Sequence, residues 1–372
     1  MKFYMPVKVY HETDCVRSHA AELCALGRKA LIVTGKSSAA KCGALGDVEE
    51  ALEQGGRQFC VFNEVEENPS VETIVRGAQL GCAEGADFVI GIGGGSPMDA
   101  AKAVAFLMKR TGAGADAEHN GVTLQSALTD LYDASLPADA LPVAAVPTTC
   151  GTGSEVTGVS VLTRHDKRAK GSIPHKIFPK LALVDAKYLA AAPRKVLVNT
   201  SVDAFAHLAE SFMSRKADAY SMAPAIAGLS IWGSIRECLL EKNAPAPEEL
   251  ERMMRASVFG GMAIAQTGTC LPHALGYTLT YELGIPHGPA CGYFLAGFLR
   301  EAGEEDREAV LDAAGFADFD ELEEFLGDAL GNPAVPQEIL EQAYETMLAN
   351  TQRLQSSRIE VDAKVLRRIV FN

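Results

Sequence analysis

The sequence predicts an α/β domain with a parallel, Rossmann-like sheet, followed by a domain made only of helices. In the first half of the chain, short runs rich in β-branched residues alternate with helical patterns, which is typical of a parallel sheet covered by helices on both faces. From about Pro193 the strand patterns stop and long helical patterns follow. The length of 372 residues also exceeds the ~250–300 residues at which a single core stops growing. We therefore expect two domains, at residues 1–190 and 191–372.

The expected strands are short apolar runs that recur between helical patterns. They cover Ala30–Thr34, Gln58–Phe62, Asp87–Ile92, Pro142–Pro147 and Leu181–Asp185. The expected helices cover Val71–Ala83, Val202–Met213, Met222–Leu240 and Pro247–Ala265. Leu322, Phe325 and Leu326 are spaced for one more amphipathic helix, within an acidic segment from Glu301 to Asp328.

Composition argues against several classes of protein. A hydrophobic content of 48% and a charged content of 22% are typical of a globular protein. The net charge of -14 argues against nucleic acid or an anionic membrane as a partner, because such surfaces recruit basic patches. Nine cysteines without a C-x-x-C pair predict neither a disulfide framework nor a zinc ribbon. No apolar run approaches the ~20 residues of a membrane helix and no signal-peptide pattern opens the chain, so we expect a cytoplasmic protein.

A glycine-rich loop follows the third expected strand and leads into a helical pattern. Its sequence is GIGGGSPMDAAKAVA, and it contains Gly93, Gly94, Gly95 and Ser96. Ser96 and Asp99 have the spacing of a capping box at the start of the next helix. Consecutive glycines let a ligand approach the backbone, and free amides at a helix start attract a phosphate. The loop is either a plain tight turn or a phosphate-binding loop, and the three glycines favour phosphate.

A second polar loop, PTTCGTGSEVTG, follows the fourth expected strand. Its candidate ligand hydroxyls belong to Thr148, Thr149, Thr152 and Ser154. In a doubly wound sheet, such loops gather at the carboxyl ends of the strands, where ligands bind. Alone this loop could be an ordinary solvated loop. Beside the glycine-rich loop it predicts the other half of a nucleotide site.

The segment TSVDAFAHLAE carries the first candidate metal ligands. Asp203 and His207 are four positions apart, so both side chains project from one face of a helix, and the pair is compatible with one divalent ion. An alternative is that Thr200 and Asp203 form a capping box and that His207 is an ordinary helix histidine.

His273 and His287 lie in the apolar segment HALGYTLTYELGIPHG. No Lys or Arg occurs from Ala256 to Leu299, so these imidazoles have no cationic competitors from their own segment. A core histidine at 273 and a turn histidine at 287 remain alternatives. With Asp203 and His207 they would make a set of one aspartate and three histidines that leaves a position open for a substrate oxygen.

Four segments of this chain resemble the iron-containing (group III) alcohol dehydrogenase family. They are GGGSPMDAAK, PTTCGTGSEVT, DAFAHLAE and HALGYTLTYELGIPHG, and the resemblance covers roughly residues 5 to 300. It implies a dehydroquinate synthase-like architecture with a dinucleotide-binding domain and a helical metal-binding domain. It also implies a cytoplasmic homodimer that transfers a hydride between NAD(P)H and an alcohol or aldehyde.

The resemblance assigns site residues as well. It implies that Fe²⁺ or Zn²⁺ is bound by Asp203, His207, His273 and His287. It implies that the cofactor is contacted by Gly93, Gly94, Gly95, Ser96, Asp99, Thr148, Thr149, Thr152 and Ser154. A bound cation polarises the substrate oxygen. The imidazoles must be neutral to bind it, so activity is expected to fall in acid.

This chain departs from the family at Tyr277. Many members carry a second histidine at this place, four positions after the first histidine of the late pair and beside substrate and nicotinamide. A phenol can also donate a proton, so Tyr277 is the candidate catalytic residue.

The residues after the first expected strand bear on the choice of cofactor. An acidic side chain there would bond the ribose 2′-OH and repel a 2′-phosphate. This chain has Gly35, Lys36 and Ser37 instead, which favours NADP over NAD, although a glycine that serves only as a turn is an alternative. The absence of Lys and Arg from Ala256 to Leu299 favours small neutral substrates.

Two other functions remain open at the level of sequence. One is a polyol or sugar-phosphate dehydrogenase, or a lyase, on the same scaffold, which would need basic residues for an anionic substrate. The other is a non-catalytic nucleotide-binding protein whose histidines are structural.

Overall fold

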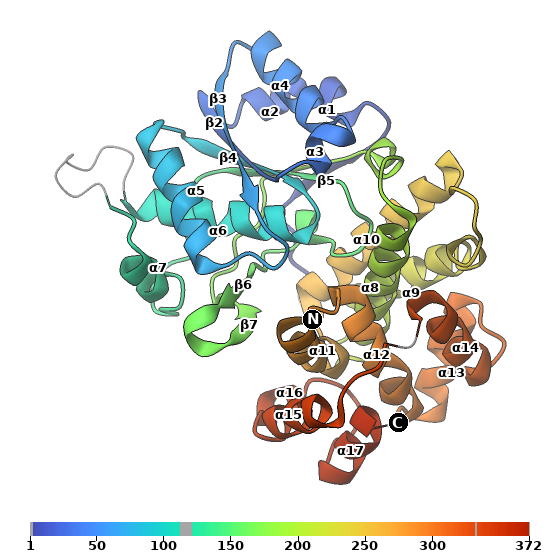
Figure 1. Ribbon diagram of the computed structural model, residues 1–372. Helices are drawn as coiled ribbons and strands as arrows, with labels where there is room; N and C mark the ends of the chain where they lie inside the picture. The colour runs from blue at the N-terminus through green and yellow to red at the C-terminus, as the bar shows by residue number, and fades with distance from the viewer. Residues whose placement is uncertain (1–2, 112–120, 332, 372) are drawn as a thin grey trace. The chain divides into compact units, whose positions relative to one another are not determined.

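Six strands form one parallel sheet in the first half of the chain, as the alternation of strands and helices predicts (Figure 1). The computed structural model describes residues 3–111, 121–331 and 333–371. The order of strands across the sheet is β1-β8-β5-β4-β2-β3. Their bounds are β1 Lys8–His11, β2 Lys29–Gly35, β3 Gln58–Val65, β4 Phe88–Gly93, β5 Val143–Pro147 and β8 Leu181–Val184.

All five expected strands are confirmed, and three further strands, β1, β6 and β7, were not expected. β1 was not expected because its four residues, KVYH, are only partly buried and show no apolar run. β6 (Val161–Arg164) and β7 (Ala169–Ser172) form a separate antiparallel pair. The β7 sequence, AKGS, lacks any β-branched residue, so only its pairing with β6 makes it a strand.

The sheet is covered on both faces, and its strands alternate between two hydrophobic cores. Ala30 and Ile32 of β2 face one core, which includes residues of α1 (Cys15–Ser18) and α4 (Ala44–Gln54). Leu31 and Val33 face the other, which includes α5 (Val71–Ala83) and α6 (Gly95–Thr111). Burial on both faces explains the nearly continuous apolar runs that predicted these strands. The shorter helices of this part are α2 Ala20–Cys24, α3 Ser38–Lys41 and α7 Leu124–Asp130.

The strand order places a topological switch point between β2 and β4. From β2 the chain moves outward to β3, and it then returns across β2 to form β4. Ligands of open α/β sheets bind at the carboxyl ends of the strands at such a point. The carboxyl ends here are Gly35 and Gly93, and both precede loops that the sequence analysis assigned to the cofactor.

The second half of the chain is built of helices, as expected. They are α8 Arg194–Met213, α9 Ala219–Gly233, α10 Pro247–Thr267, α11 Leu271–Leu283, α12 His287–Arg300, α13 Glu304–Ala314, α14 Phe319–Leu330, α15 Gln337–Leu348, α16 Thr351–Leu354 and α17 Ala363–Phe371. Leu322, Phe325 and Leu326 are the buried face of α14, which confirms the amphipathic pattern. No helix in the described ranges is long and apolar enough to span a membrane.

Two helix boundaries differ from the expectation. Helix α8 begins at Arg194, directly after Pro193, rather than at Val202. Thr200 and Asp203 therefore lie inside the helix, which excludes the alternative that they form a capping box. The hydroxyl of Thr200 donates instead to the carbonyl of Val196, 2.8 Å away. Helix α9 ends at Gly233, before the expected end at Leu240.

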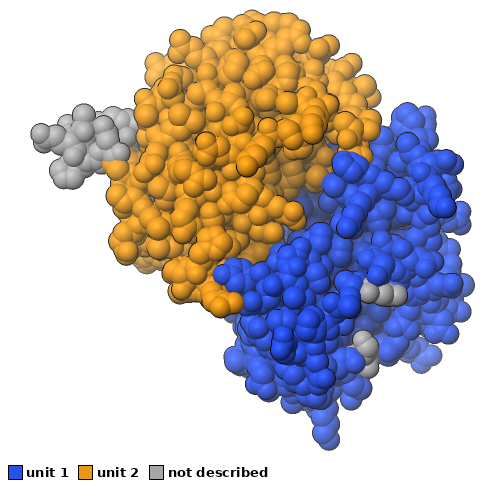
Figure 2. All heavy atoms as spheres, viewed as in Figure 1, with its two compact units in different colours: residues 1–4, 150–153, 193–372 blue, residues 5–149, 154–192 orange. Residues whose placement is uncertain are grey.

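The chain divides into two compact units, which are coloured separately in Figure 2. The α/β unit contains Met5–Thr149 and Ser154–Ala192. The helical unit contains Pro193–Asn372 together with the short segments Met1–Tyr4 and Cys150–Gly153. Each unit therefore has its own set of predicted ligand residues.

Candidate metal centre

Helix α8 carries three buried polar side chains on one face. Asp203, His207 and Glu210 are separated by four and three positions, a spacing that places them on the same side of the helix. Their exposed fractions are only 2%, 5% and 0%. Buried polar and charged groups are costly unless each finds a partner. Groups from other helices must therefore complete this face of α8.

Helices α11 and α12 supply the two late histidines. His273 lies in the first turn of α11, and His287 is the first residue of α12. Two glycines allow the close helix contacts. A Cβ on Gly276 would lie 3.1 Å from the backbone of α12, and a Cβ on Gly288 would lie 1.8 Å from the carbonyl oxygen of Asn199 on α8. The glycines of the segment thus serve helix packing, which brings the imidazoles to Asp203.

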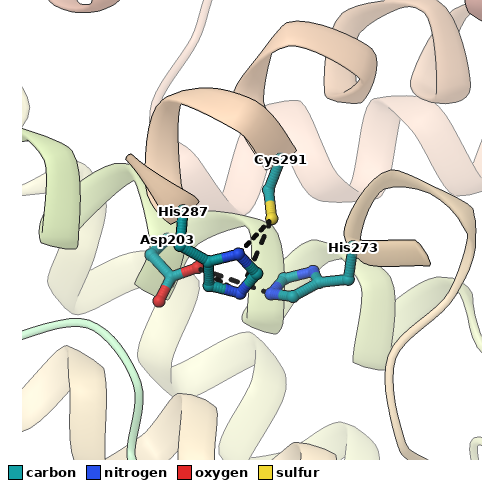
Figure 3. Close-up of side chains that lie close together, drawn as sticks. All are labelled: Asp203, His273, His287 and Cys291. Atoms are coloured by element: carbon teal, nitrogen blue, oxygen red, sulfur yellow. Dashed lines mark hydrogen bonds and ion pairs between the residues drawn. The ribbon is translucent and has the colours of Figure 1, made fainter. Parts of the chain in front are cut away.

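Asp203, His273, His287 and Cys291 form a compact cluster of potential metal ligands (Figure 3). One ligand atom of each residue lies within 4.8 Å of those of the others. Asp203 Oδ1 is 3.4 Å from His273 Nε2 and 3.8 Å from His287 Nε2. Cys291 Sγ is 3.6 Å from His287 Nδ1. A carboxylate, two imidazoles and a thiol are donors that suit Zn²⁺ or Fe²⁺.

Two atoms of the cluster are buried and lack a hydrogen-bond partner among the described residues. They are Asp203 Oδ1 and His273 Nε2, and their 3.4 Å contact does not have hydrogen-bond geometry. An unsatisfied buried polar atom costs about 1–3 kcal/mol. A divalent cation would satisfy both atoms at once. The residues therefore fit the metal that the family resemblance implies.

Glu210 holds the ring of His273 in place. Its Oε1 is hydrogen-bonded to His273 Nδ1, and its Oε2 accepts the backbone N–H of Cys270 at 2.6 Å. A carboxylate on one ring nitrogen fixes the orientation of the imidazole and leaves the other nitrogen for a metal. Here that other nitrogen is Nε2, the atom nearest Asp203.

The electrostatics of the cluster favour a negative carboxylate beside a protonated imidazole. Burial alone would raise the pKa of Asp203, but the nearby imidazoles, His207 foremost, hold it well below its ordinary range. Burial alone would lower the pKa of His273, but Cys291 and Glu210 raise it well above its usual value. A cation that binds here must displace the proton of His273, so binding weakens as the pH falls.

His207 lies against this cluster but is not one of the four mutually close ligands. Its ring stacks on that of His273 with a centroid distance of 4.3 Å. Its Nδ1 lies 3.1 Å from the carbonyl oxygen of Gly151, which can only accept, so Nδ1 carries the hydrogen. This tautomer leaves Nε2 with a free lone pair for a cation. Burial is the main cause that lowers the pKa of His207, so the protonated form of the ring is disfavoured.

Tyr277, the candidate catalytic residue, lies beside the cluster. Its ring is stacked on that of His287, with centroids 5.7 Å apart and an interplanar angle of 16°. It is half-buried on α11, one helical turn after His273. The phenol is therefore next to a metal-site imidazole, as its place in the sequence suggested.

Two residues of the centre, Cys291 and Glu210, were not predicted from the sequence. Cys291 is four positions after His287 and Glu210 is three positions after His207, so both spacings put the residue on the ligand-bearing face of its helix. This helical spacing was the available signal. It could not be used for Cys291 because the helix was not expected to begin at His287.

The loops predicted to bind the cofactor follow three neighbouring strands of the α/β unit. Gly35 ends β2, Gly93 ends β4, and Thr148 follows β5, and these strands lie side by side in the order β5-β4-β2. Gly93 has a φ of 148°, and a Cβ there would lie 2.6 Å from Pro97. A Cβ on Gly94 would lie 3.1 Å from Thr149. Glycine is thus required where the chain leaves β4 for α6.

The capping box expected at Ser96 and Asp99 is wrong. Helix α6 begins at Gly95, and the Ser96 hydroxyl accepts the N–H of Asn68 at 3.1 Å. Asp99 accepts the Ser154 hydroxyl at 2.6 Å and the N–H of Val161 at 2.8 Å. These tertiary donors take the side-chain oxygens that would otherwise cap the helix. Asp99 therefore joins the two polar loops to each other.

The remaining predicted cofactor residues lie in different places. Lys36 and Ser37 are exposed directly after β2. In the α/β unit, Thr148 and Ser154 are buried and Thr149 is half-buried. The Ser154 hydroxyl also accepts a hydrogen bond from the ammonium group of the buried Lys102, at 2.6 Å. Thr152 belongs to the helical unit.

The α/β unit has a parallel sheet with a glycine-rich loop at its switch point, and the helical unit has a buried Asp/His/His cluster. These two features together define a metal-dependent dehydrogenase that uses a nicotinamide dinucleotide. Comparison with known proteins gives the particular family. A model described as iron-containing alcohol dehydrogenase matches residues 6–186. A second, described as the C-terminal part of the Fe-containing alcohol dehydrogenase family, matches residues 197–346.

Individual relatives agree with these models. Sulfoacetaldehyde reductase of Bilophila wadsworthia is 34% identical over 317 residues, which cover 83% of this chain and 77% of that protein. The crystal structure of an iron-containing alcohol dehydrogenase from Thermotoga maritima superposes with a TM-score of 0.87 at 35% identity, over 99% of this chain and 98% of that one. Sulfoacetaldehyde reductase of Bifidobacterium kashiwanohense, in complex with NAD⁺, gives a TM-score of 0.82 at 26% identity, over 99% and 97%.

The chain belongs to the iron-containing alcohol dehydrogenase family, and it is an NAD(P)-dependent oxidoreductase that acts on alcohols or aldehydes. The resemblance inferred from the four sequence segments is confirmed. The family match extends to residue 346, beyond the limit of about residue 300 that the sequence resemblance gave.

Proposed function

We propose that this enzyme interconverts small neutral aldehydes and alcohols, with NADPH preferred over NADH, at a divalent metal held in the helical unit. The observation that carries the proposal is the buried cluster of Asp203, His273 and His287. Its atoms Asp203 Oδ1 and His273 Nε2 have no hydrogen-bond partner in the described part of the chain. A structural histidine cluster would satisfy these atoms internally, so the unsatisfied pair favours a metalloenzyme over a non-catalytic nucleotide-binding protein.

Each residue of the centre has a distinct task in this proposal. A bound Fe²⁺ or Zn²⁺ supplies Lewis acidity toward the substrate oxygen. Asp203 supplies the negative charge that compensates the cation, and Glu210 keeps Nε2 of His273 directed at Asp203. His207 is proposed as a further ligand through Nε2, because its Nδ1 hydrogen is held by Gly151. His287 completes the set.

Tyr277 is proposed to carry the proton that accompanies hydride transfer. Its ring lies parallel to that of His287, so the phenol is next to the imidazole that binds the metal. We therefore expect Tyr277→Phe to lower kcat by about 10²–10⁴-fold, the range of general acid–base catalysis. Metal content should stay unchanged, because the phenol is not assigned as a ligand.

The cofactor is proposed to bind at the carboxyl ends of β2, β4 and β5. The backbone from Gly93 to Ser96, at the start of α6, would accept the pyrophosphate. The hydroxyls of the second loop, Thr148, Thr149, Thr152 and Ser154, would lie along the dinucleotide. Asp99 would position this loop through its bond to Ser154 rather than through the cofactor.

A preference for NADPH is proposed from the residues after β2. Gly35 is followed by the exposed residues Lys36 and Ser37, and no carboxylate occupies the place that would repel a 2′-phosphate. Lys36→Glu should lower kcat/KM for NADPH and leave that for NADH nearly unchanged. The complex of the Bifidobacterium relative with NAD⁺ points the other way, so an equal or higher kcat/KM with NADH would reject the preference.

Neutral substrates are proposed because the segment from Ala256 to Leu299, which holds both late histidines, has no Lys or Arg. The two sulfoacetaldehyde reductases among the relatives act on a substrate with a negative sulfonate, so they offer a direct contrast. A charged substrate that binds in a buried site needs a cationic partner.

The deciding experiment uses anaerobically prepared apo-protein and compares butyraldehyde with sulfoacetaldehyde as substrates. Each substrate is tested with and without added Fe²⁺, and with NADPH or NADH as cofactor. Turnover of butyraldehyde that needs the metal and is faster with NADPH supports the whole proposal. Faster turnover of sulfoacetaldehyde rejects the neutral substrate. Cofactor binding without turnover under any metal would revive the lyase and non-catalytic alternatives. The homodimer implied by the family is tested on the same preparation by light scattering.

A further inference from the structure

We propose that the thiolate of Cys291 is a ligand of the metal, so that the protein donors include Asp203, His273, His287 and Cys291. This inference rests on the proposed metal-dependent function, and it identifies a ligand that the sequence pattern of the family did not indicate. Cys291 lies on α12, four positions after His287, so both residues project from the same face of that helix. Its side chain points toward the imidazoles of His273 and His287 (Figure 3).

The distances suit a shared cation. Zn–N bonds of ~2.0–2.1 Å and Zn–S bonds of ~2.3 Å place tetrahedral donors roughly 3.3–3.6 Å apart. Cys291 Sγ is 3.6 Å from His287 Nδ1 and 3.8 Å from its Nε2. Asp203 Oδ1 is 3.4 Å from His273 Nε2 and 3.8 Å from His287 Nε2. Small shifts of these side chains would therefore bring all four donors onto one ion.

The surroundings of Cys291 distinguish it from other buried cysteines of the helical unit. Cys270 donates to the carbonyl oxygen of Glu210 and Cys150 contacts the hydroxyl of Thr200, which are ordinary partners of a structural thiol. Cys291 is fully buried, and its sulfur contacts imidazole nitrogens. It also faces the two atoms that lack partners in the described structure, Asp203 Oδ1 and His273 Nε2. A thiol that only filled space would not need to point at these atoms.

Binding converts the thiol into a thiolate. The S–H bond of Cys291 breaks, the proton leaves to the solvent, and the sulfur electron pair forms the bond to the cation. With the proposed ligand His207, the ion would have five protein donors, and a substrate oxygen would take a sixth position. A thiolate is also a softer donor than imidazole or carboxylate. It should therefore raise the affinity for Zn²⁺ relative to Fe²⁺.

The test is the absorption spectrum of the full-length protein loaded with Co²⁺, a spectroscopic substitute for Zn²⁺. A cobalt–thiolate bond gives intense charge-transfer absorption in the near ultraviolet, whereas oxygen and nitrogen donors give only weak ligand-field bands in the visible. We expect the charge-transfer band in the wild type and its loss in Cys291→Ser. The matched control is Cys238→Ser, because Cys238 is buried in the same unit but lies outside the cluster. The control should keep the band.

A second readout is the affinity for Zn²⁺, measured by competition with a chromogenic chelator. Loss of a hydrogen-bonded partner behind a ligand already weakens metal binding by about 10–100-fold. Loss of the ligand itself in Cys291→Ser should therefore weaken it by at least about tenfold, and by less for Fe²⁺. If Cys291→Ser does not fold, zinc-edge X-ray absorption of the wild type decides, since it should contain one sulfur at ~2.3 Å.

Two results would overturn the inference, and they are distinguishable. Ligand-field bands without a charge-transfer band, or a zinc spectrum without sulfur, would show that a metal binds and that Cys291 is not its ligand. The proposed metal-dependent function would then stand. If the wild type binds neither Co²⁺ nor Zn²⁺, both the inference and the proposed function are wrong.

Discussion

Glu210 lies behind His273, and we expect it to influence metal binding without being a ligand itself. It is fully buried on α8 and bonds His273 through one oxygen and the N–H of Cys270 through the other. Glu210→Gln keeps the shape but removes the negative charge behind the imidazole. We expect the affinity for Zn²⁺ to fall by about 10–100-fold, the usual effect of a lost partner behind a ligand. Isothermal titration with Zn²⁺ measures it.

The control for this prediction is Glu237→Gln, since Glu237 is exposed in the same unit. Its zinc affinity should equal that of the wild type. Equal affinities for Glu210→Gln and the wild type would mean that the hydrogen bond to His273 has no influence on the metal.

Glu155 is a buried carboxyl in the second polar loop. It is 1% exposed, and neither of its oxygens has a hydrogen-bond partner among the described residues. Burial raises its pKa from the ordinary value of 4.5 to about 7. The folded protein thus holds a proton that the unfolded chain releases. The resulting stabilisation is present at low pH and is lost as the pH rises from 4.5 through about 7.

Glu155→Gln removes this pH dependence because an amide does not ionise. As the pH rises from 5 to 8, the free energy of unfolding of the wild type should fall relative to that of the variant. The slope is about 1.4 kcal/mol per pH unit up to the pKa, and the total fall is about 3 kcal/mol. Urea unfolding at several pH values measures this difference. Glu53→Gln, an exposed change in the same unit, should parallel the wild type. A parallel curve for Glu155→Gln would mean that Glu155 ionises normally.

At the scale of elements, the metal centre depends on how closely α12 packs on α8. Gly288 follows His287, and a Cβ at this position would lie only 1.8 Å from the carbonyl oxygen of Asn199. Helix α12 must move away from α8 if Gly288 becomes alanine. Such overpacking costs about 1–3 kcal/mol, and it would also carry His287 away from Asp203.

We therefore expect Gly288→Ala to lower both the thermal midpoint and the affinity for Zn²⁺, as measured by scanning calorimetry with and without the metal. Gly303→Ala is the matched control. Gly303 has a φ of -56° and no atom within 4 Å of its added Cβ, so this change should affect neither quantity. A stable Gly288→Ala protein with full zinc affinity would contradict the role assigned to this helix contact.

At the scale of the whole molecule, each compact unit holds its own predicted ligand site. The metal ligands belong to the helical unit, and the loops after β2, β4 and β5 belong to the α/β unit, apart from Thr152. A ligand at 100 times its Kd stabilises the state that binds it by about 2.7 kcal/mol. Each ligand should therefore slow amide exchange mainly in the unit that contains its site.

Hydrogen exchange monitored by mass spectrometry measures this effect. Adding Zn²⁺ to the apo-protein should slow exchange in α8, α11 and α12, and adding NADPH should slow exchange at the end of β4 and the start of α6. The protein without either ligand is the reference. Protection of β4 and α6 by Zn²⁺ alone, with none in α8, would contradict the assignment of the sites.

Much of the architecture could be predicted because it follows from local patterns. The five buried strands and helix α5 are apolar runs with clear periodicity, and the glycine-rich loop could be read directly from its composition. β1 and β7 could not, since their short polar sequences become strands only through pairing. The capping boxes at Ser96 and Thr200 failed for a related reason. At the first site, Ser96 and Asp99 make tertiary hydrogen bonds in place of capping bonds. At the second, the helix begins earlier, at Arg194, so Thr200 is not at its end.

The sequence by itself determined the two-part architecture, the family and the candidate ligands Asp203, His273 and His287, because each of these depends on residue type, period and spacing along the chain. Only the tertiary structure decided that Glu210 bonds His273, 63 positions away, and that Cys291 faces the same centre. It also decided that His207 directs one nitrogen at Gly151. These contacts depend on how α8, α11 and α12 pack, and packing brings together atoms whose separation along the chain carries no information about their distance in space.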